Sequence, residues 1–217
     1  MPIFFVAMIK VIPFIYEDTD ELFANTYLLQ DENNDCAIID PGKDYPGLVN
    51  YIEKNALHLK AVLLTHGHTD HMRGVDRLAS TFNTPLHVGF DDECMLADTY
   101  LNCSFFLGEN VSVKTKPNTL ADAQVLHFLS EDIICIHTPY HTAGSICYYL
   151  KESGFLFSGD FILPHGVGRS DLPNAKPREL KTSMAKIIAL PKDTKIYPGH
   201  GTFSNIETEL KVNPFVK

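Results

Sequence analysis

Three features that often reveal the class of a protein are missing from this sequence: a long hydrophobic run, a Cys-x-x-Cys pair and an excess of basic residues. A helix that spans a bilayer needs about 20 apolar residues, and no stretch of the chain approaches that length. Lys and Arg number 18 against 27 Asp and Glu, which gives a net charge of −9. Because nucleic-acid phosphates favour a basic surface, we predict no nucleic-acid partner. Because no stretch is long and apolar enough, we also predict no membrane partner.

The five cysteines are odd in number and form no metal-type pair, so we predict reduced thiols and a reducing compartment. The apolar segment 1–15 is interrupted by Lys10 and Pro13 and lacks a basic start and a cleavage site. These observations predict a cytoplasmic protein. No linker, repeat or low-complexity run divides the 217 residues, so we expect a single domain over residues 1–217. Nothing in the sequence indicates the oligomeric state.

Hydrophobic periodicity predicts strands and helices in two similar halves. In the first half we expect strands at 10–16, 25–30, 36–39 and 60–64, and helices at 46–55 and 71–81. In the second half we expect strands at 124–129, 132–137, 145–150, 155–158 and 195–197, and a helix at 179–190. Two mixed halves suggest two sheets packed face to face with helices outside, which is an α/β four-layer αββα sandwich.

Histidine is the abundant functional residue, with ten copies. Three of them share one short turn with an aspartate, as His66, His68, Asp70 and His71, directly after the strand 60–64. Crowding imidazoles and a carboxylate in one turn has little structural use, whereas a divalent metal needs ligands that converge. In extended backbone, His66 and His68 can point the same way because they are two positions apart. The turn therefore predicts a metal site.

Three later segments place metal-type residues at the ends of predicted strands. His141 follows strand 132–137, Asp160 leaves strand 155–158 through a glycine, and His200 follows strand 195–197. Loops at the carboxyl ends of strands in α/β proteins gather at one edge. Together with the first cluster they give five histidines and two aspartates, enough for two metals. Among the remaining histidines, His165 could reach the pocket as a proton shuttle, although simple exposure to solvent is favoured.

The order His66-x-His68-x-Asp70-His71, then His141, Asp160 and His200, resembles the metallo-β-lactamase fold superfamily over almost the whole chain. Gly159-Asp160, the run Gly166-Val167-Gly168-Arg169-Ser170-Asp171-Leu172-Pro173, the ending Pro198-Gly199-His200-Gly201 and the final Asn213-Pro214-Phe215 look like its small glyoxalase II-like (hydroxyacylglutathione hydrolase-like) members. The resemblance implies an αββα sandwich with a dinuclear centre. It implies one metal held by His66, His68 and His141, another held by Asp70, His71 and His200, and Asp160 as a bridge.

Nitrogen and oxygen ligands suit divalent ions, so we expect two Zn²⁺ ions, with iron or manganese as alternatives. Metals that share a hydroxide would provide a nucleophile at neutral pH and polarise a substrate carbonyl. Asp160 and Asp70 are the candidate catalytic residues, Asp160 as the bridge and Asp70 as a proton donor if it is loosely bound.

The chemistry of the leaving group limits which class of substrate is expected. A thiolate, whose parent thiol has a pKa of about 8.5, departs with little protonation, whereas an amide nitrogen needs a proton donor. The motif loops contain no obvious general acid besides Asp70. We therefore expect a metal-dependent hydrolase whose partner is a small-molecule thioester, similar to an S-acylglutathione.

Two residues are candidates for substrate binding. Arg169 lies in a glycine-bracketed loop shortly after Asp160, and a guanidinium binds a carboxylate well. The resemblance implies that it contacts the glutathione part of the substrate, while a structural pair with Asp171 is equally expected. Tyr140 stands where the family usually has glycine, which predicts a narrower pocket or a strained loop.

Other functions remain open. The glyoxalase II family carries an extra carboxyl-terminal helical region that contacts glutathione, and the residues after His200 are too few to form it. Persulfide dioxygenases share the fold and hold a single iron with residues matching His66, His141 and Asp160, which makes a mononuclear iron oxidoreductase the second hypothesis. A metal-binding protein without catalysis is the third, and the complete ligand set argues against it.

Overall fold

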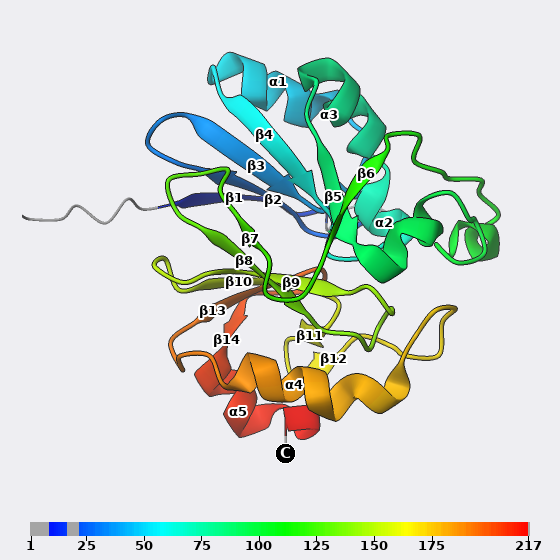
Figure 1. Ribbon diagram of the computed structural model, residues 1–217, viewed down its shortest axis with the longest axis vertical. Helices are drawn as coiled ribbons and strands as arrows, with labels where there is room; N and C mark the ends of the chain where they lie inside the picture. The colour runs from blue at the N-terminus through cyan, green and yellow to red at the C-terminus, as the bar shows by residue number, and fades with distance from the viewer. Residues whose placement is uncertain (1–8, 17–21, 217) are drawn as a thin grey trace, which may run out of the picture.

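The computed structural model describes residues 9–16 and 22–216, and residues 1–8, 17–21 and 217 lie outside that description. Two six-stranded sheets pack face to face, and helices cover the outer face of each (Figure 1). This arrangement confirms the predicted four-layer αββα sandwich. No helix among the described residues is both long enough and apolar enough to cross a membrane.

The first sheet has the strand order β1-β2-β3-β4-β5-β6. Its strands are β1 (Lys10–Phe14), β2 (Thr26–Gln30), β3 (Asp35–Ile39), β4 (His58–Leu63), β5 (Leu86–Gly89) and β6 (Pro117–Leu120). Helices α1 (Pro46–Lys54), α2 (Thr69–Met72) and α3 (Val75–Phe82) belong to this half, with short 3-10 helices at Phe90–Leu96 and Ser104–Leu107. β3, β4, β5 and β6 run parallel to one another, so their carboxyl ends share one edge.

The second sheet has the order β14-β13-β10-β9-β8-β7, and a separate two-stranded ribbon pairs β11 with β12. Its strands are β7 (Val125–Leu126), β8 (Ile133–His137), β9 (Ile146–Leu150), β10 (Phe155–Gly159), β13 (Lys195–Pro198) and β14 (Ser204–Asn205). The ribbon is β11 (Ile162–Leu163) with β12 (Gly166–Val167), and the helices are α4 (Leu180–Ile188) and α5 (Ile206–Val212), with 3-10 turns at Pro177–Glu179 and Pro214–Val216.

Alternating side chains on the strands produce three apolar layers. On β2, Tyr27 and Leu29 face the second sheet, whereas Leu28 faces the helices. In the second sheet, Tyr148 points into the layer between the sheets and Tyr149 packs under α4 and α5. Burial of all three layers at about 25 cal/mol per Å² of apolar surface is the main force that holds the sheets together.

Several predicted elements differ from the observed ones. The expected helix at 71–81 is two helices, because the Gly74 N–H donates to Pro41 O (2.7 Å) and a Cβ at Gly74 would crowd the backbone at Pro41 and Lys43. The expected strand at 124–129 is reduced to Val125–Leu126. Strands β5 and β6 and helix α5 were not predicted, since their short segments show too few turns or alternations for a periodic signal.

The topology places the predicted ligands. The loop with His66 follows β4, the loop with His141 follows β8, Asp160 follows β10, and His200 follows β13. β10 and β13 are parallel, as are β3 and β4, so these four loops gather at one edge of the sandwich. The edge that carries the carboxyl ends of the strands therefore carries the candidate site.

Candidate metal centre

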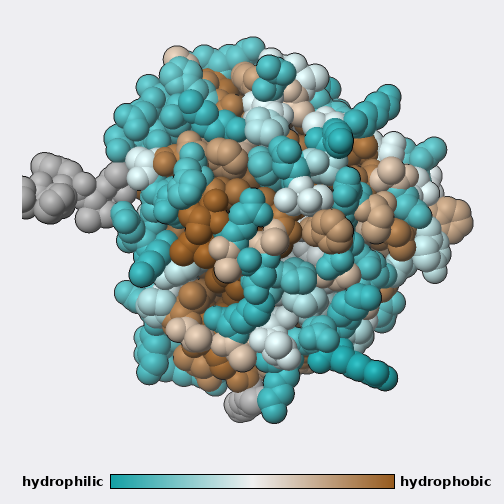
Figure 2. Space-filling view, in the orientation of Figure 1, coloured by the Kyte–Doolittle hydropathy of each residue, from teal (hydrophilic) through white to brown (hydrophobic). Residues whose placement is uncertain are grey.

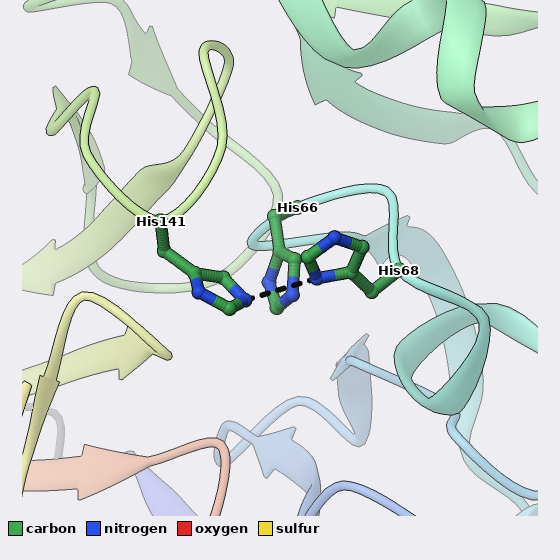
Figure 3. A group of neighbouring side chains, drawn as sticks. All are labelled: His66, His68 and His141. Atoms are coloured by element: carbon green, nitrogen blue, oxygen red, sulfur yellow. Dashed lines mark hydrogen bonds between the residues drawn. The ribbon is translucent and has the colours of Figure 1, made fainter. Parts of the chain in front are cut away.

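His66, His68 and His141 form one half of the site and face one another across the edge of the two sheets (Figure 3). All three are buried. His68 Nδ1 and His141 Nε2 lie 2.9 Å apart, and the His66 and His141 ring centroids are 4.7 Å apart. One nitrogen from each ring lies within 4.8 Å of the other two. Three imidazole nitrogens at this spacing can converge on a single divalent ion.

Asp70, His71 and His200 form the second half. His200 Nε2 lies 3.0 Å from Asp70 Oδ2, and His71 Nε2 lies 3.7 Å from the same oxygen. Asp160 lies between the two halves, with Oδ2 3.6 Å from His141 Nε2 and 3.7 Å from His200 Nε2. The structure thus brings together all seven side chains that the sequence singled out as ligands.

Buried atoms in this cluster lack ordinary partners. Among the described residues, His66 Nε2, His71 Nε2 and Asp160 Oδ1 have no hydrogen-bond partner. Leaving such an atom buried and unpaired costs about 1–3 kcal/mol. Imidazole nitrogens and carboxylate oxygens that converge without another use fit divalent ions such as zinc, iron or manganese.

The pKa shifts of the clustered histidines also fit a metal site. Burial lowers the pKa of His66, and the neighbouring His71 and His141 lower it further. Burial would also lower the pKa of His71, but the carboxylates of Asp40 and Asp70 outweigh it and raise that pKa. Neutral imidazoles are the form that binds metal, and divalent ions would supply the positive charge that the buried carboxylates require.

Asp40, at the end of β3, orients the ligands and was not predicted as a site residue. Its carboxylate is buried, with Oδ2 3.0 Å from His71 Nδ1 and accepting a hydrogen bond from Thr65 Oγ1 at 2.7 Å. Thr65 Oγ1 in turn lies 3.2 Å from His66 Nδ1. Partners on the Nδ1 side fix each ring so that Nε2 faces the site. Asp40 follows the end of a strand as Asp160 does, so the same sequence signal applies to it.

Asp92 connects the ligand loops to one another. Its fully buried carboxylate accepts hydrogen bonds from the N–H of Gly67 (3.1 Å), the N–H of Gly144 (2.7 Å) and the hydroxyl of Thr142 (2.6 Å). Asn174 Nδ2 donates to it as well, at 3.0 Å. One carboxylate thus fastens the His66–His68 loop to the His141 loop. No sequence signal marks Asp92, because it lies in a segment without clear periodicity.

The loops that carry His141 and His200 are held by hydrogen bonds from side chains to backbone carbonyls. His141 Nδ1 donates to the carbonyl oxygen of Arg169 at 2.6 Å, which leaves Nε2 free to face the site. Asn25 Nδ2 donates to the carbonyls of Pro198 (3.1 Å) and Gly201 (3.0 Å), on either side of His200. A Cβ at Gly199 would overlap the carboxylate of Asp160 and the ring of His71, so only glycine fits there.

A cavity of about 880 Å³ opens over the cluster. Asp70, Asp160, His141 and His200 reach its surface, and Arg169 lies on its rim. The Arg169 side chain is exposed and pairs with Asp171 in a two-pronged contact (Nε–Oδ1 2.7 Å, Nη2–Oδ2 2.8 Å). Both readings of Arg169 therefore fit, since a residue on the rim can hold the loop and still contact a substrate.

Tyr140 lies in the apolar core beside the site. Its side chain is 6% exposed, packs edge-on against Phe161 in the layer under α4, and is not part of the cavity lining. Its backbone φ is not positive either, so the loop is not strained at this position. The Tyr140 ring thus packs in the core, and a contact between Tyr140 and substrate stays a prediction. His165 is exposed and also lies outside the lining, as the sequence favoured.

The family model described as "Metallo-beta-lactamase superfamily" matches residues 19–200. The chain belongs to the metallo-β-lactamase superfamily. Among curated relatives of this metallo-β-lactamase superfamily protein, the Bacillus subtilis "Probable metallo-hydrolase YqgX" is 33% identical over 195 residues, covering 89% of this chain and 92% of the relative. The Haemophilus influenzae "Hydroxyacylglutathione hydrolase GloC" is 30% identical over 202 residues, covering 88% and 92%.

Solved structures of the superfamily superimpose closely. The BLEG-1 B3 metallo-β-lactamase is 32% identical with a TM-score of 0.87 and covers 96% of this chain and 99% of its own. TTHA1623, in a di-iron-bound form, is 29% identical with a TM-score of 0.82 over 94% and 100%. ETHE1 from Myxococcus xanthus is 25% identical with a TM-score of 0.74 over 94% and 83%. These neighbours place the chain within a superfamily of metallo-hydrolases without fixing its substrate or its metal.

Proposed function

We propose that the protein is a metal-dependent hydrolase of small thioesters, similar to the S-acylglutathione hydrolases. One observation carries the proposal: two complete ligand groups share Asp160 at the floor of a cavity large enough for a small substrate. The relative that is named a hydroxyacylglutathione hydrolase supports it.

The ligand groups assign the metals. His66, His68 and His141 would hold one divalent ion, Asp70, His71 and His200 the other, and Asp160 would contact both. When bound, such ions would lower the pKa of bound water and polarise the substrate carbonyl. Asp40 and Asp92 keep the ligand rings and loops in place, which limits the rearrangement needed during turnover.

Leaving-group chemistry favours a thioester over an amide. Water adds to the carbonyl carbon, the C–S bond breaks, and the electron pair leaves on sulfur, so the products are a carboxylate, a thiol and one proton. A thiolate needs little protonation as it leaves. Asp70 lines the cavity as a carboxylate, because burial would raise its pKa but His71 and His200 outweigh burial and lower it. Cys103 is a weak acid, since burial raises its pKa to about 11. Neither side chain is a strong proton donor at neutral pH, which suits a thiolate leaving group.

The experiment is thiol release from S-lactoylglutathione by protein reconstituted with Zn²⁺, Mn²⁺ or Fe²⁺, with Asp160→Ala as the comparison. We expect turnover by the wild type and a loss of about 10³-fold or more in the variant, since one carboxylate serves both ligand groups. Metal content is measured in both proteins, and Asp193→Ala, at an exposed aspartate outside the cavity lining, serves as the control. No turnover by the wild type with any of the three metals would contradict the proposal.

A second candidate function is a mononuclear iron oxidoreductase of the persulfide dioxygenase type, supported by the similarity to ETHE1. It would use His66, His141 and Asp160 and leave the second ligand group empty. Oxygen consumption by the iron-loaded protein with glutathione persulfide distinguishes the two, because the hydrolase consumes none. The complete second group, Asp70, His71 and His200, favours the hydrolase.

A further inference from the structure

Aromatic side chains stand exposed beside the metal centre, on the segment between β5 and β6. Tyr100, Phe105, Phe106 and Leu107 are each at least half exposed, and the ring centroids of Tyr100 and Phe106 lie 5.2 Å apart. Figure 2 shows apolar side chains where this segment projects from the molecule. Large apolar groups gathered on a surface usually mark a binding site, because water disfavours leaving them exposed.

The segment is built to hold these rings in place. Asn102 is fully buried; its Nδ2 donates to Val111 O (2.9 Å) and its Oδ1 accepts from the Ser104 N–H (3.0 Å). The Thr69 N–H, in the ligand loop, donates to the Asn102 carbonyl at 2.9 Å. The exposed rings are thus attached through Asn102 directly to the element that carries Asp70 and His71. We call Tyr100, Phe106 and Leu107 the aromatic wall.

The aromatic wall and the ligands line the same cavity. Leu163, Val167 and Leu172 supply further apolar surface to that cavity. Apart from the histidines, Arg169 is the one cationic side chain among the described residues of the lining, and Asp171 already neutralises it. The lining thus offers one cationic side chain, already paired, and a wide apolar surface, so it provides more contact for an apolar group than for a negative charge.

We propose that the substrate is a thioester with an apolar, medium-length acyl chain that lies along the aromatic wall; this inference rests on the proposed thioester hydrolysis. The carrier thiols of cells are polar or charged, so the apolar part of a natural thioester is its acyl chain. With the thioester carbonyl at the ligand cluster, the acyl chain extends over Tyr100 and Phe106. The thiol part of the substrate then points toward the rim, where Arg169 lies.

The first experiment compares acetyl and octanoyl thioesters of the same small neutral thiol, N-acetylcysteamine, using metal-loaded protein. Each methylene that leaves water favours binding, so we expect kcat/KM for octanoyl to exceed that for acetyl by about tenfold or more. In the double variant Tyr100→Ser/Phe106→Ser this ratio falls to about threefold or less. The matched control is Phe90→Ser, an exposed aromatic outside the cavity lining, and it should keep the wild-type ratio.

The second experiment measures binding without turnover. Calorimetry with the non-hydrolysable ketone S-(2-oxononyl)-N-acetylcysteamine, which mimics the octanoyl thioester, should show binding about tenfold or more tighter than its 2-oxopropyl counterpart. The preference should disappear in the double variant and persist in Phe90→Ser.

The outcomes separate this inference from the proposed function. If the thioesters are hydrolysed with equal kcat/KM and the two ketones bind equally, the apolar chain is wrong and the hydrolase stands. If no thioester is hydrolysed but the long ketone still binds through the wall, the hydrolase is wrong and the apolar subsite stands. If the double variant changes only the sedimentation behaviour and not the chain-length preference, the wall is a surface for self-association and the inference is overturned.

Discussion

The floor of the cavity, formed by the metal-ligand residues, and its aromatic wall differ in which side chains are buried and which are exposed. On the floor, charged and polar side chains are buried, and Asp40 and Asp92 fix the ligand loops from behind. On the wall, apolar rings are exposed, and the polar side chain that holds them, Asn102, is buried beneath. In both regions a buried polar residue holds the functional side chains in place. It can do so because a polar group whose hydrogen bonds are all made in the interior has one low-energy geometry. The polar floor would then carry out the reaction, and the apolar wall would bind the substrate.

The largest effect is expected where the floor loses an orienting carboxylate. Asp40→Asn keeps the shape but weakens the contact with His71 Nδ1 and Thr65, so the affinity for Zn²⁺ should fall about 10–100-fold. Competition with a chromogenic chelator measures it. Asp35→Asn, on the opposite end of β3, is the control and should bind zinc normally. Equal affinity in Asp40→Asn and the wild type would mean that the rings are fixed without this carboxylate.

The next effect concerns the residue that fastens two ligand loops together. Asp92→Ala leaves the N–H groups of Gly67 and Gly144 buried without their acceptor, so the free energy of unfolding should fall by about 3 kcal/mol. Chemical denaturation of the wild type and variant measures the loss. Its exposed neighbour gives the control Asp91→Ala, which should change stability little. A stable Asp92→Ala would show that the loops are held by their remaining contacts.

A smaller effect is expected at the rim, between floor and wall. Arg169→Ala keeps the backbone carbonyl that orients His141 but removes the guanidinium, so KM for S-lactoylglutathione should rise about three- to tenfold with kcat little changed. Steady-state kinetics beside Arg178→Ala, an exposed arginine on the α4 side, tests it. Unchanged KM would leave Arg169 with only its structural pair, Asp171.

The smallest change in stability is expected at Asp76, whose carboxylate holds the segment that follows the aromatic wall. The Asp76 carboxylate accepts the N–H of Lys114 (2.9 Å) and the hydroxyl of Thr115 (2.7 Å), after the wall segment returns toward β6. Burial would raise its pKa, but these hydrogen bonds outweigh it and lower the pKa below 3.8. A lowered folded-state pKa stabilises the protein above the unfolded value, and the benefit is lost as the pH falls through the folded value. Asp76→Asn should therefore reduce stability at pH 7, by less than Asp92→Ala does.

Denaturation at two pH values tests the sign of that prediction. The difference between the wild type and Asp76→Asn should shrink as the pH is lowered below 3.8. A difference that stays constant, or grows, in acid would show that the carboxylate is not the stabilising form.

Much of the architecture was predictable because the signals are local. Alternation on the strands and helical periodicity in α1 and α4 depend on neighbours within one segment, and they led to the αββα sandwich. β5, β6 and the break at Gly74 were missed. Their conformation depends on pairing with β4 and on a contact between Gly74 and Pro41, which lie far apart along the chain. The burial of Tyr140 was not predictable for the same reason, since only the packed layer under α4 shows that its ring has a buried partner.

The sequence by itself determined the chemistry of the floor. His66, His68, Asp70 and His71 lie within six positions, so the local backbone keeps them close together, and His141, Asp160 and His200 were recognisable as residues at strand ends. The tertiary structure decided what surrounds them. Asp40 and Asp92 act on the ligands from behind, and the rings of Tyr100 and Phe106 join the cavity through Asn102. These contacts join segments distant in the chain, so the registers and topology of the two sheets, rather than any local pattern, bring them together.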